Sequence, residues 1–252
     1  MILVVDVGNT NVVAGISDNG NWAAHWRIST DCKKTVDEYT AMFYQLLSMD
    51  RIAPEGVEKI VLSSVVPDLT GVFIDMINRV FGKDPLVVTN QVNTGLADQQ
   101  LPPELGSDLL ANTVAAYHRF KRDAMIIDFG TALTFITVSH DGFILGVALA
   151  PGIITAVNSL SSNTAQLPKV ALREPPSVLG MDTVTAIQSG VLYGYAGLVT
   201  GIIVRTESAV GRPLFIIATG GMASVAKGVI GRIDHVDPWH TLEGLRIIAD
   251  LN

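Results

Sequence analysis

One segment of this sequence occurs twice, and the repeat limits the folds that the chain can adopt. Near the N-terminus an apolar run ends in Asp6, a turn containing Gly8 follows, and a second apolar run leads to another turn. Residues 125–142 repeat this design without a gap, with Asp128 and Gly130 at the same offset. The match extends through Ser17 and Ser139 to Gly20 and Gly142. Two apolar runs joined by a turn predict a β-hairpin. The sequence therefore predicts one domain plan used twice.

The turns of the two hairpins carry groups suited to phosphate and cations. Asp6 and Asp128 each follow a predicted strand, beside a glycine whose backbone can approach a ligand closely. Backbone N–H groups in such turns can hold phosphate oxygens, and a carboxylate can hold a cation directly or through water. Further donors follow in the chain at Asn9, Thr10, Asn11 and Thr131.

Two interpretations of these turns remain open. Each Asp-x-Gly could be only a tight turn closed by a bond from its side chain to the backbone. The alternative is that two hairpins face each other across a cleft and bind a nucleoside triphosphate from both sides. Two copies in register, each near the start of a half-chain, favour the nucleotide site.

Composition indicates a well-buried globular protein. Of the 252 residues, 48% are hydrophobic and only 16% are charged, which suits a large core and a sizeable subunit interface. The most apolar region, 143–157, is too short to span a bilayer and contains Gly146, Pro151 and Gly152. We therefore expect no membrane segment.

Charge and cysteine content exclude other classes of function. A net charge of −7 argues against binding to a nucleic acid backbone. The lone Cys32 excludes an internal disulfide framework and a cysteine zinc site, and the five histidines show no metal-ligand spacing. The N-terminus shows no basic segment or cleavage site typical of a signal peptide. These features predict a cytoplasmic protein.

The first half reads as a mixed α/β domain. Its predicted elements are strands at 2–5, 12–16, 22–28, 60–66 and 85–88 and helices at 35–49 and about 69–80. This order favours a mixed sheet with helices on its faces. The polar, proline-containing segment 93–103 is the best candidate for a loop at a site or boundary.

A helix follows Gly106, and its first residues have two possible roles. Ser107 or Asp108 could cap the helix through its side chain. Alternatively, Asp108 points from the helix start into a cleft and acts as a general base.

The second half repeats the pattern. It is predicted to contain strands near 124–128, 133–138, 143–149 and 214–218 and helices at about 151–164, 183–207 and 241–249. Gly190, Gly194, Gly197 and Gly201 interrupt the long helix, and we expect them to pack closely on another backbone, within or between subunits. Gly220 and Gly221 follow a strand, where a turn or a purine or ribose contact is equally expected.

Several motifs together resemble type III pantothenate kinases, in the same order and over nearly the whole chain. They are Asp6-Val-Gly-Asn-Thr-Asn, residues 63–67, Leu105-Gly-Ser-Asp, Asp128-Phe-Gly-Thr, Ala150-Pro-Gly-Ile, residues 163–168 and Thr219-Gly-Gly. The resemblance implies an α/β fold of two tandem ribonuclease-H-like domains, with mixed sheets flanked by helices and an ATP cleft between them. We place the domains at 1–118 and 119–252.

The resemblance also implies an activity. It is the ATP-dependent phosphorylation of pantothenate to 4'-phosphopantothenate, the first step of coenzyme A biosynthesis. A homodimer, a divalent cation such as Mg²⁺ and a monovalent cation, K⁺ or NH₄⁺, are implied as well.

Site residues carry over by position. Asp108 would be the base, Asp6 would lie near magnesium, through water, and Asp128 would hold the monovalent cation. The ATP ligands would be Asp6, Val7, Gly8, Asn9, Thr10, Asn11, Val12, Val13, Gly130, Thr131, Gly220 and Gly221. The acceptor pocket would contain Gln99, Gly106, Ser107, Asp108, Leu109 and Thr183.

The acceptor side departs from the family pattern. The family usually has Gly-Ala-Asp-Arg, whereas this chain has Gly106-Ser107-Asp108-Leu109, and Gln99 stands where a tyrosine is usual. Leucine cannot bond a carboxylate as arginine does. Three alternatives therefore stay open beside a full kinase: a weakened kinase, an inactive nucleotide-binding regulatory paralogue, and a kinase of another small hydroxyl substrate.

Overall fold

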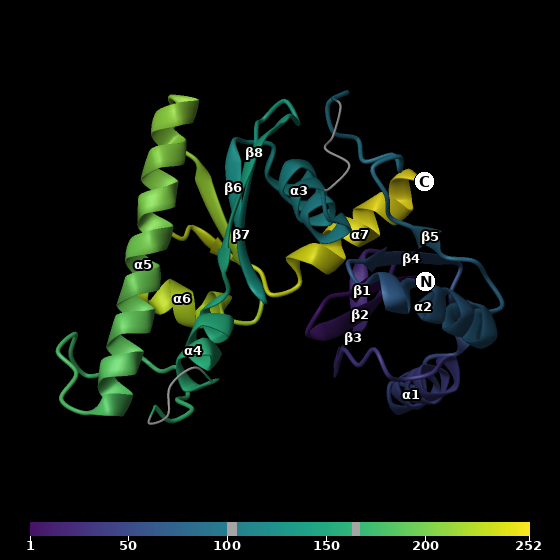
Figure 1. Cartoon of the computed structure of the whole chain (residues 1–252). Helices are drawn as coiled ribbons and strands as arrows, with labels where there is room; N and C mark the ends of the chain where they lie inside the picture. Colours follow the sequence, from purple (N-terminus) through teal and green to yellow (C-terminus); the bar gives the residue numbers. More distant parts are fainter. Residues whose placement is uncertain (100–104, 163–166) are drawn as a thin grey trace. The chain divides into compact units, whose positions relative to one another are not determined.

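A computed structural model describes residues 1–99, 105–162 and 167–252 (Figure 1). The chain forms two compact units, one of Met1–Arg119 with His240–Asn252 and one of Phe120–Trp239. The sequence-based division into 1–118 and 119–252 assigns the last helix to the second half, whereas this helix belongs to the first unit, which extends to Arg119. Residues 100–103 of the expected loop and 163–166 of one family motif lie outside the described residues.

The first unit is built on a five-stranded mixed sheet. Strand order is β3-β2-β1-β4-β5, with β1 antiparallel to β2 and parallel to β4. The strands are β1 (Ile2–Val7), β2 (Asn11–Asp18), β3 (Asn21–Ser29), β4 (Lys59–Ser64) and β5 (Leu86–Val87). The helices are α1 (Val36–Met49), α2 (Pro67–Phe81), α3 (Ser107–Phe120) and α7 (His240–Leu251), with a short 3₁₀ turn at Pro54–Gly56.

Local sequence explains where these helices begin and end. Thr35 and Glu38 form a capping box at the start of α1. Helix α2 begins at Pro67, where no backbone N–H is needed, and ends at Gly82 in the left-handed conformation. Their apolar faces bring Tyr39 and Phe73 together, with ring centroids 4.7 Å apart, in the core against the sheet.

The second unit repeats the topology of the first. Its strands run in the order β8-β7-β6-β9-β10, with β6 antiparallel to β7 and parallel to β9. The strands are β6 (Ala124–Phe129), β7 (Ala132–Val138), β8 (Ile144–Pro151), β9 (Phe215–Thr219) and β10 (His235–Val236), and the helices are α4 (Ile153–Ser162), α5 (Thr183–Val210) and α6 (Ala223–Val229). The predicted duplication of a mixed sheet flanked by helices is confirmed.

The sequence suggests a repeat without a gap, but strand pairing in the two sheets does not keep a constant offset. Asp6 pairs with Val13, but Asp128 pairs with Thr134, one residue earlier than a constant offset requires. The turn of the second hairpin is one residue shorter, and the turn after β7 makes up the difference. With this shift, the irregularity between Ile16 and Ser17 in the first sheet matches the one between Thr137 and Val138 in the second.

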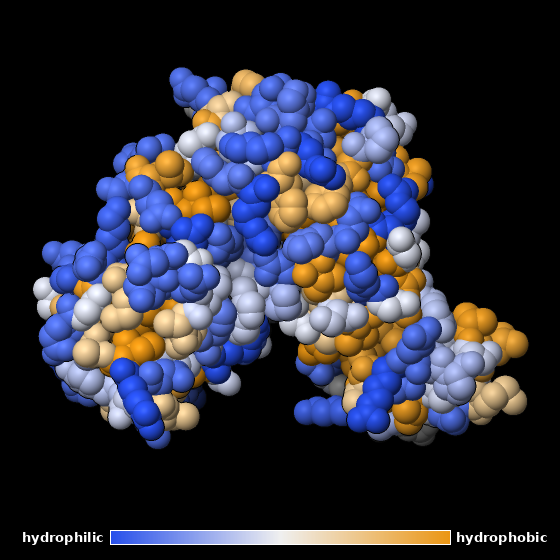
Figure 2. Space-filling view, turned by 180° about the vertical axis from the view of Figure 1, so that it is seen from behind, coloured by the Kyte–Doolittle hydropathy of each residue, from blue (hydrophilic) through white to orange (hydrophobic). Residues whose placement is uncertain are grey.

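Helix α5 uses only part of its surface inside the second unit. Val199 and Ile203 are fully buried in the core. On the exposed side, nothing described lies within 4 Å of the Cβ position at Gly190, Gly194 or Gly197, so the expected packing against these glycines does not occur within the described chain. The helix is long and apolar enough to cross a membrane by length and composition alone, with 28% of the relevant window buried. Figure 2 shows hydrophobic residues gathered at the surface of this unit.

Helix α7 follows the second sheet in sequence but packs on the first. It lies against β1, β2 and β4, and it touches α3 through close backbone contact. A Cβ at Gly244 would overlap the carbonyl group of Ala111. Asn112 of α3 also accepts hydrogen bonds from Thr241 Oγ1 at 2.8 Å and, through its carbonyl oxygen, contacts His240 Nε2 at 3.1 Å. Helices α3 and α7 are therefore fixed to one another.

We expect Gly244→Ala to destabilise the first unit, because the added methyl group must push α3 and α7 apart. Overpacking of this kind costs about 1–3 kcal/mol. Gly71→Ala in α2 is the matched control, since nothing lies within 4 Å of its Cβ position and alanine favours helix by about 1 kcal/mol. Thermal unfolding followed by circular dichroism should show a lower melting temperature for Gly244→Ala only. Equal melting temperatures for both variants would contradict the close packing.

Candidate functional site

Hydrogen bonds within its own backbone and from Thr30 fix the conformation of the first Asp-x-Gly turn. The Gly8 N–H donates to the Asn11 carbonyl at 3.0 Å, and Thr30 Oγ1 donates to the Gly8 carbonyl at 2.6 Å. The Thr30 N–H donates to the Thr10 carbonyl at 3.0 Å, which fixes the turn against the end of β3. The side chains of Asn9 and Thr10 remain exposed at the tip. Thr30 was not among the predicted site residues, because it lies far from the turn in sequence.

Two of the valines near this turn are buried in the core, unlike the exposed polar residues at its tip. Val7 is fully buried and Val12 is 1% exposed, and both belong to the core of the first unit. Their side chains therefore face away from any ligand, and only their backbone groups remain available to one. Val13 is half-buried on the next strand position.

Asp6 lies at the end of β1, where a serine of the neighbouring strand holds it. Ser63 pairs with Asp6 across β1 and β4, and its hydroxyl donates to Asp6 Oδ1 at 2.7 Å. Ser63 is fully buried, and its Oγ lies 2.9 Å from the Oγ of Ser107 at the start of α3. Sequence analysis quoted Ser63 within a family motif but gave it no role. The parallel pairing of β1 with β4 is what brings it to Asp6.

Asp108 sits in the first turn of α3, in a place kept clear by a glycine. A Cβ at Gly106 would overlap Asp108 Oδ1 and would lie 3.6 Å from a methyl group of Val65. The carboxylate accepts the Leu109 N–H at 2.8 Å, which is a local bond at the helix start. Burial raises the pKa of Asp108 above its usual range, and the backbone bonds oppose this shift only in part. A carboxylate with a raised pKa is a stronger base than an exposed one.

The helix cap considered for Ser107 or Asp108, one of the two alternatives left open, is only partly observed. Ser107 directs its hydroxyl at Ser63, and Asp108 accepts from the next residue. The first helical backbone bond runs from Leu110 N–H to the Gly106 carbonyl at 3.0 Å.

The second Asp-x-Gly turn assembles the corresponding groups in the second unit. Asp128 is the last residue but one of β6 and pairs with Thr219 of β9, as Asp6 pairs with Ser63 in the first unit. Gly220 has φ of +89°, and a Cβ there would overlap Asp128 Oδ1 and the backbone of Phe129. Gly130 is also close, since its Cβ would lie 3.4 Å from Asp128 Oδ1. The second unit therefore places Asp128 close to Gly130 and Gly220. All three are among the residues predicted to bind ATP or a cation.

The start of α4 fixes the position of Thr131. The Thr131 carbonyl accepts the Gly152 N–H at 3.1 Å and Thr155 Oγ1 at 2.8 Å. A Cβ at Gly152 would overlap the carbonyl oxygens of Gly130 and Thr131, so glycine is required for this contact. The residue Thr131 itself is exposed, as is Gly221 on the neighbouring turn.

The remaining acceptor candidates are divided between the two units. Gln99 is half-buried and ends the described part of its loop in the first unit. Thr183 is the exposed first residue of α5 in the second unit, just after the cap Asp182. Leu109 is half-buried beside Asp108.

The carboxylates Asp6 and Asp128 do not form a cage of protein ligands. Within residues 1–99, 105–162 and 167–252, no group of three or more His, Cys, Asp or Glu side chains could hold a metal ion. Mg²⁺ typically keeps several waters and binds to one or two carboxylates together with substrate phosphates. A single strand-end carboxylate beside an open turn fits that mode of binding.

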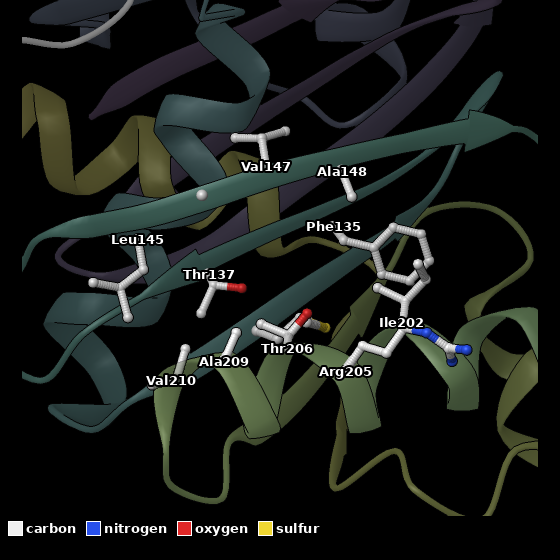
Figure 3. Close-up of a pocket in the computed structure, with 12 residues that line it drawn as sticks. Phe135, Thr137, Leu145, Val147, Ala148, Ile202, Arg205, Thr206, Ala209 and Val210 are labelled. Atoms are coloured by element: carbon white, nitrogen blue, oxygen red, sulfur yellow. The ribbon is translucent and has the colours of Figure 1, made fainter.

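A groove in the second unit lies apart from all of these residues. It has a volume of about 290 Å³ and lies between α5 and the strands β6, β7 and β8 (Figure 3). Phe135 and Thr137 line it on the sheet side, and Ile202, Arg205 and Thr206 line it on the helix side. None of the predicted site residues belongs to its lining, so we do not assign it to the nucleotide or the acceptor.

Comparison with known proteins agrees with these features. The sequence model described as type III pantothenate kinase matches residues 2–205. A type III pantothenate kinase of Moorella thermoacetica is 42% identical over 253 aligned positions, which cover 100% of both chains. One of Syntrophus aciditrophicus is 39% identical with the same coverage.

A solved structure shows the same fold. A putative N-acetylglucosamine kinase from Porphyromonas gingivalis superposes with a TM-score of 0.56 at 12% identity, covering 98% of this chain and 99% of that one. At this identity the likeness concerns the fold alone, and it agrees with two mixed sheets of a two-domain ATPase. The full-length sequence matches and the shared architecture lead to one conclusion: the chain belongs to the type III pantothenate kinase family.

Proposed function

We propose that this chain phosphorylates pantothenate with ATP and that Asp108 is the base in the reaction. Membership of the family supplies the reaction class, a phosphoryl transfer to an alcohol in coenzyme A biosynthesis. The observation that carries the assignment of the base is the environment of Asp108. The residue is half-buried, burial raises the pKa of its carboxyl, and Gly106 leaves the space that the carboxylate occupies.

The chemistry requires little more than positioning and charge neutralisation. The acceptor hydroxyl oxygen forms a bond to the γ-phosphorus while the bond from that phosphorus to the bridging oxygen breaks, and ADP leaves. The hydroxyl proton passes to the Asp108 carboxylate. The raised pKa helps this transfer because a base works best when its pKa lies near the working pH.

The two strand-end turns provide the proposed ligands of ATP and the cations. In the first unit, the exposed side chains of Asn9 and Thr10 and the turn backbone would bind phosphate oxygens, and Asp6 would bind Mg²⁺ through water. In the second unit, Thr131 and the glycines 130, 220 and 221 are the proposed nucleotide contacts. Asp128 would hold K⁺ or NH₄⁺. When bound, the divalent cation neutralises the charge of the phosphates.

We expect Asp108→Asn to lower kcat by roughly 10²–10⁴-fold, the contribution typical of a general base.

Burial raises the pKa of Asp108, so folding disfavours the ionised form. The charge therefore lowers the free energy of unfolding above the unfolded-state pKa of about 4. The variant should melt at a higher temperature than wild type at pH 7, and this gain should vanish near pH 3.

The pH profile of the wild type gives the matching control. Its kcat/KM should fall as the pH decreases through the raised pKa, at a higher pH than an exposed carboxyl would give. Unchanged turnover in Asp108→Asn would remove Asp108 from the role of base.

A second candidate function rests on one observation, the leucine beside the base. Leu109 lacks the charged group that the family pattern places there, so the chain could bind nucleotide without phosphorylating pantothenate, or use another small hydroxyl substrate. An assay of ADP release with pantothenate distinguishes these cases from the proposed activity. ATP would still raise the melting temperature of an inactive nucleotide-binding protein.

If pantothenate is the acceptor, Leu109→Arg should lower its KM by about tenfold, because an arginine can bond the pantothenate carboxylate. Leu109→Lys is a control that adds charge without the planar pair of donors, and its effect should be smaller. Steady-state kinetics with varied pantothenate measures both. An unchanged KM in Leu109→Arg would mean that another group already binds the carboxylate.

We also propose that the chain works in the cytoplasm as a homodimer formed through α5. Its exposed glycines leave room for a second helix backbone, and Leu198 and Val204 are 36% and 51% exposed on the same helix. Strand β8 adds Leu149, which is 68% exposed. A second copy of this surface would cover these apolar side chains, as the family resemblance implies.

Sedimentation velocity should therefore give twice the mass of one chain for the wild type. Val204→Asp should shift the protein toward monomer, because a charge cannot be buried unpaired at an apolar interface. Val178→Asp, at a 62% exposed position outside the helix, is the control and should leave the mass unchanged. A monomeric wild type at micromolar concentration would contradict the proposal.

A further inference from the structure

We propose that Ser63 and Ser107 form a hydrogen-bonded relay that fixes the start of helix α3, and with it Asp108, against the carboxylate of Asp6. This inference rests on the proposed roles of Asp6 and Asp108. It assigns Ser63 and Ser107 as positioning residues, which act through these two carboxylates.

The geometry sets the direction of each hydrogen bond. Ser63 Oγ lies 2.7 Å from Asp6 Oδ1, and an ionised carboxylate can only accept. The single hydroxyl proton of Ser63 is therefore used on Asp6. In the contact of 2.9 Å between the two serine hydroxyls, Ser107 must then donate to Ser63. The relay runs from Ser107 through Ser63 to Asp6.

Burial makes this relay effective. Ser63 is fully buried and Ser107 is 9% exposed, so water cannot readily replace either partner. Hydrogen bonds to charged acceptors are stronger than neutral ones, and a buried hydroxyl without a partner is unfavourable. Breaking these hydrogen bonds would therefore cost free energy at both serines. This cost holds the first turn of α3 in one position.

The relay joins three elements that carry the proposed chemistry. Asp6 is the last residue but one of β1, Ser63 lies opposite it on β4, and Ser107 begins α3 one residue before Asp108. Farther along α3, Asn112 is bonded to Thr241 of α7, so the helix is held at a second point. All of these residues belong to the first unit. The position of Asp108, the proposed base, relative to Asp6, the proposed magnesium ligand, is thus set within one unit.

The second sheet shows that a hydroxyl residue suits this position. Thr219 has the place opposite Asp128 that Ser63 has opposite Asp6, and it is 1% exposed. Threonine therefore fits at the end of a central parallel strand. This makes Ser63→Thr a reasonable conservative variant that keeps the hydroxyl.

The test compares Ser63→Ala, Ser107→Ala, the double variant and Ser63→Thr with wild type. We expect Ser63→Ala to lower kcat by about tenfold or more, with the KM for pantothenate changed by less than about twofold, because positioning and not acceptor binding is lost. Ser107→Ala should have a smaller effect. The double variant should equal Ser63→Ala, since the second change removes nothing further. Ser63→Thr should recover most of the lost rate.

Ser64→Ala is the matched control. Ser64 follows Ser63 on β4, but its hydroxyl contacts Val66 and Thr70 and not Asp6. It should keep the wild-type kcat even if its melting temperature falls. A loss of rate equal to that of Ser63→Ala would overturn the relay, because the rate would then not depend specifically on the hydroxyl that contacts Asp6.

A readout without catalysis separates this inference from the proposed function. Hydrogen exchange at the amides of Leu110 and Ala111, in the first turn of α3, should be faster in Ser63→Ala and in Ser107→Ala than in wild type. Faster exchange in an enzyme without pantothenate kinase activity would support the relay while refuting the function. Unchanged exchange, or independent multiplying effects of the two alanine variants on kcat, would overturn the relay. Ser107→Ala alone decides if Ser63→Ala fails to fold.

Discussion

The structure depends on a carboxylate placed at the end of a strand that is buried on both faces. Val4 and Val5 of β1, and Ile126 and Ile127 of β6, are fully buried. Each of these strands carries an aspartate next to its last residue, and that last residue, Val7 or Phe129, is buried again. A charge so near an apolar interior is costly unless hydrogen bonds or a cation compensate it. Ser63 meets part of this need at Asp6 by donating a hydrogen bond to its carboxylate. The proposed phosphate and cation ligands lie in the turns that follow the two aspartates.

The same constraint explains which residues surround the two carboxylates. A hydroxyl residue lies opposite each aspartate on the adjacent parallel strand, Ser63 in one sheet and Thr219 in the other. Glycine is needed where the chain passes close by, as at Gly220 against Asp128. Asp108 is held differently, since it lies half-buried in the first turn of α3, where burial raises its pKa. The first unit thus gives Asp6 and Asp108 different surroundings, in keeping with the different roles proposed for them.

Sequence patterns predicted most of the fold because the hairpins and amphipathic helices are local. They missed the short α6 and β10. They also placed the repeat without a gap, because strand register depends on turn geometry as well as on the apolar pattern, and the two hairpin turns differ by one residue. The packing of α7 on the first sheet is a long-range contact that periodicity cannot reveal. Ser107 was predicted as a possible helix cap and as part of the acceptor pocket, but not as a partner of Ser63. Its partner Ser63 became evident once β4 lay beside β1.

The most direct test of the central claim is the affinity for magnesium ATP when the strand-end charge is removed. Isothermal titration calorimetry should show binding to wild type, and Asp6→Asn should bind roughly tenfold or more weakly because a charge-assisted contact is lost. Asp18→Asn, at the exposed end of β2, should bind as wild type does. A folded Asp6→Asn variant that binds magnesium ATP with unchanged affinity would contradict the account.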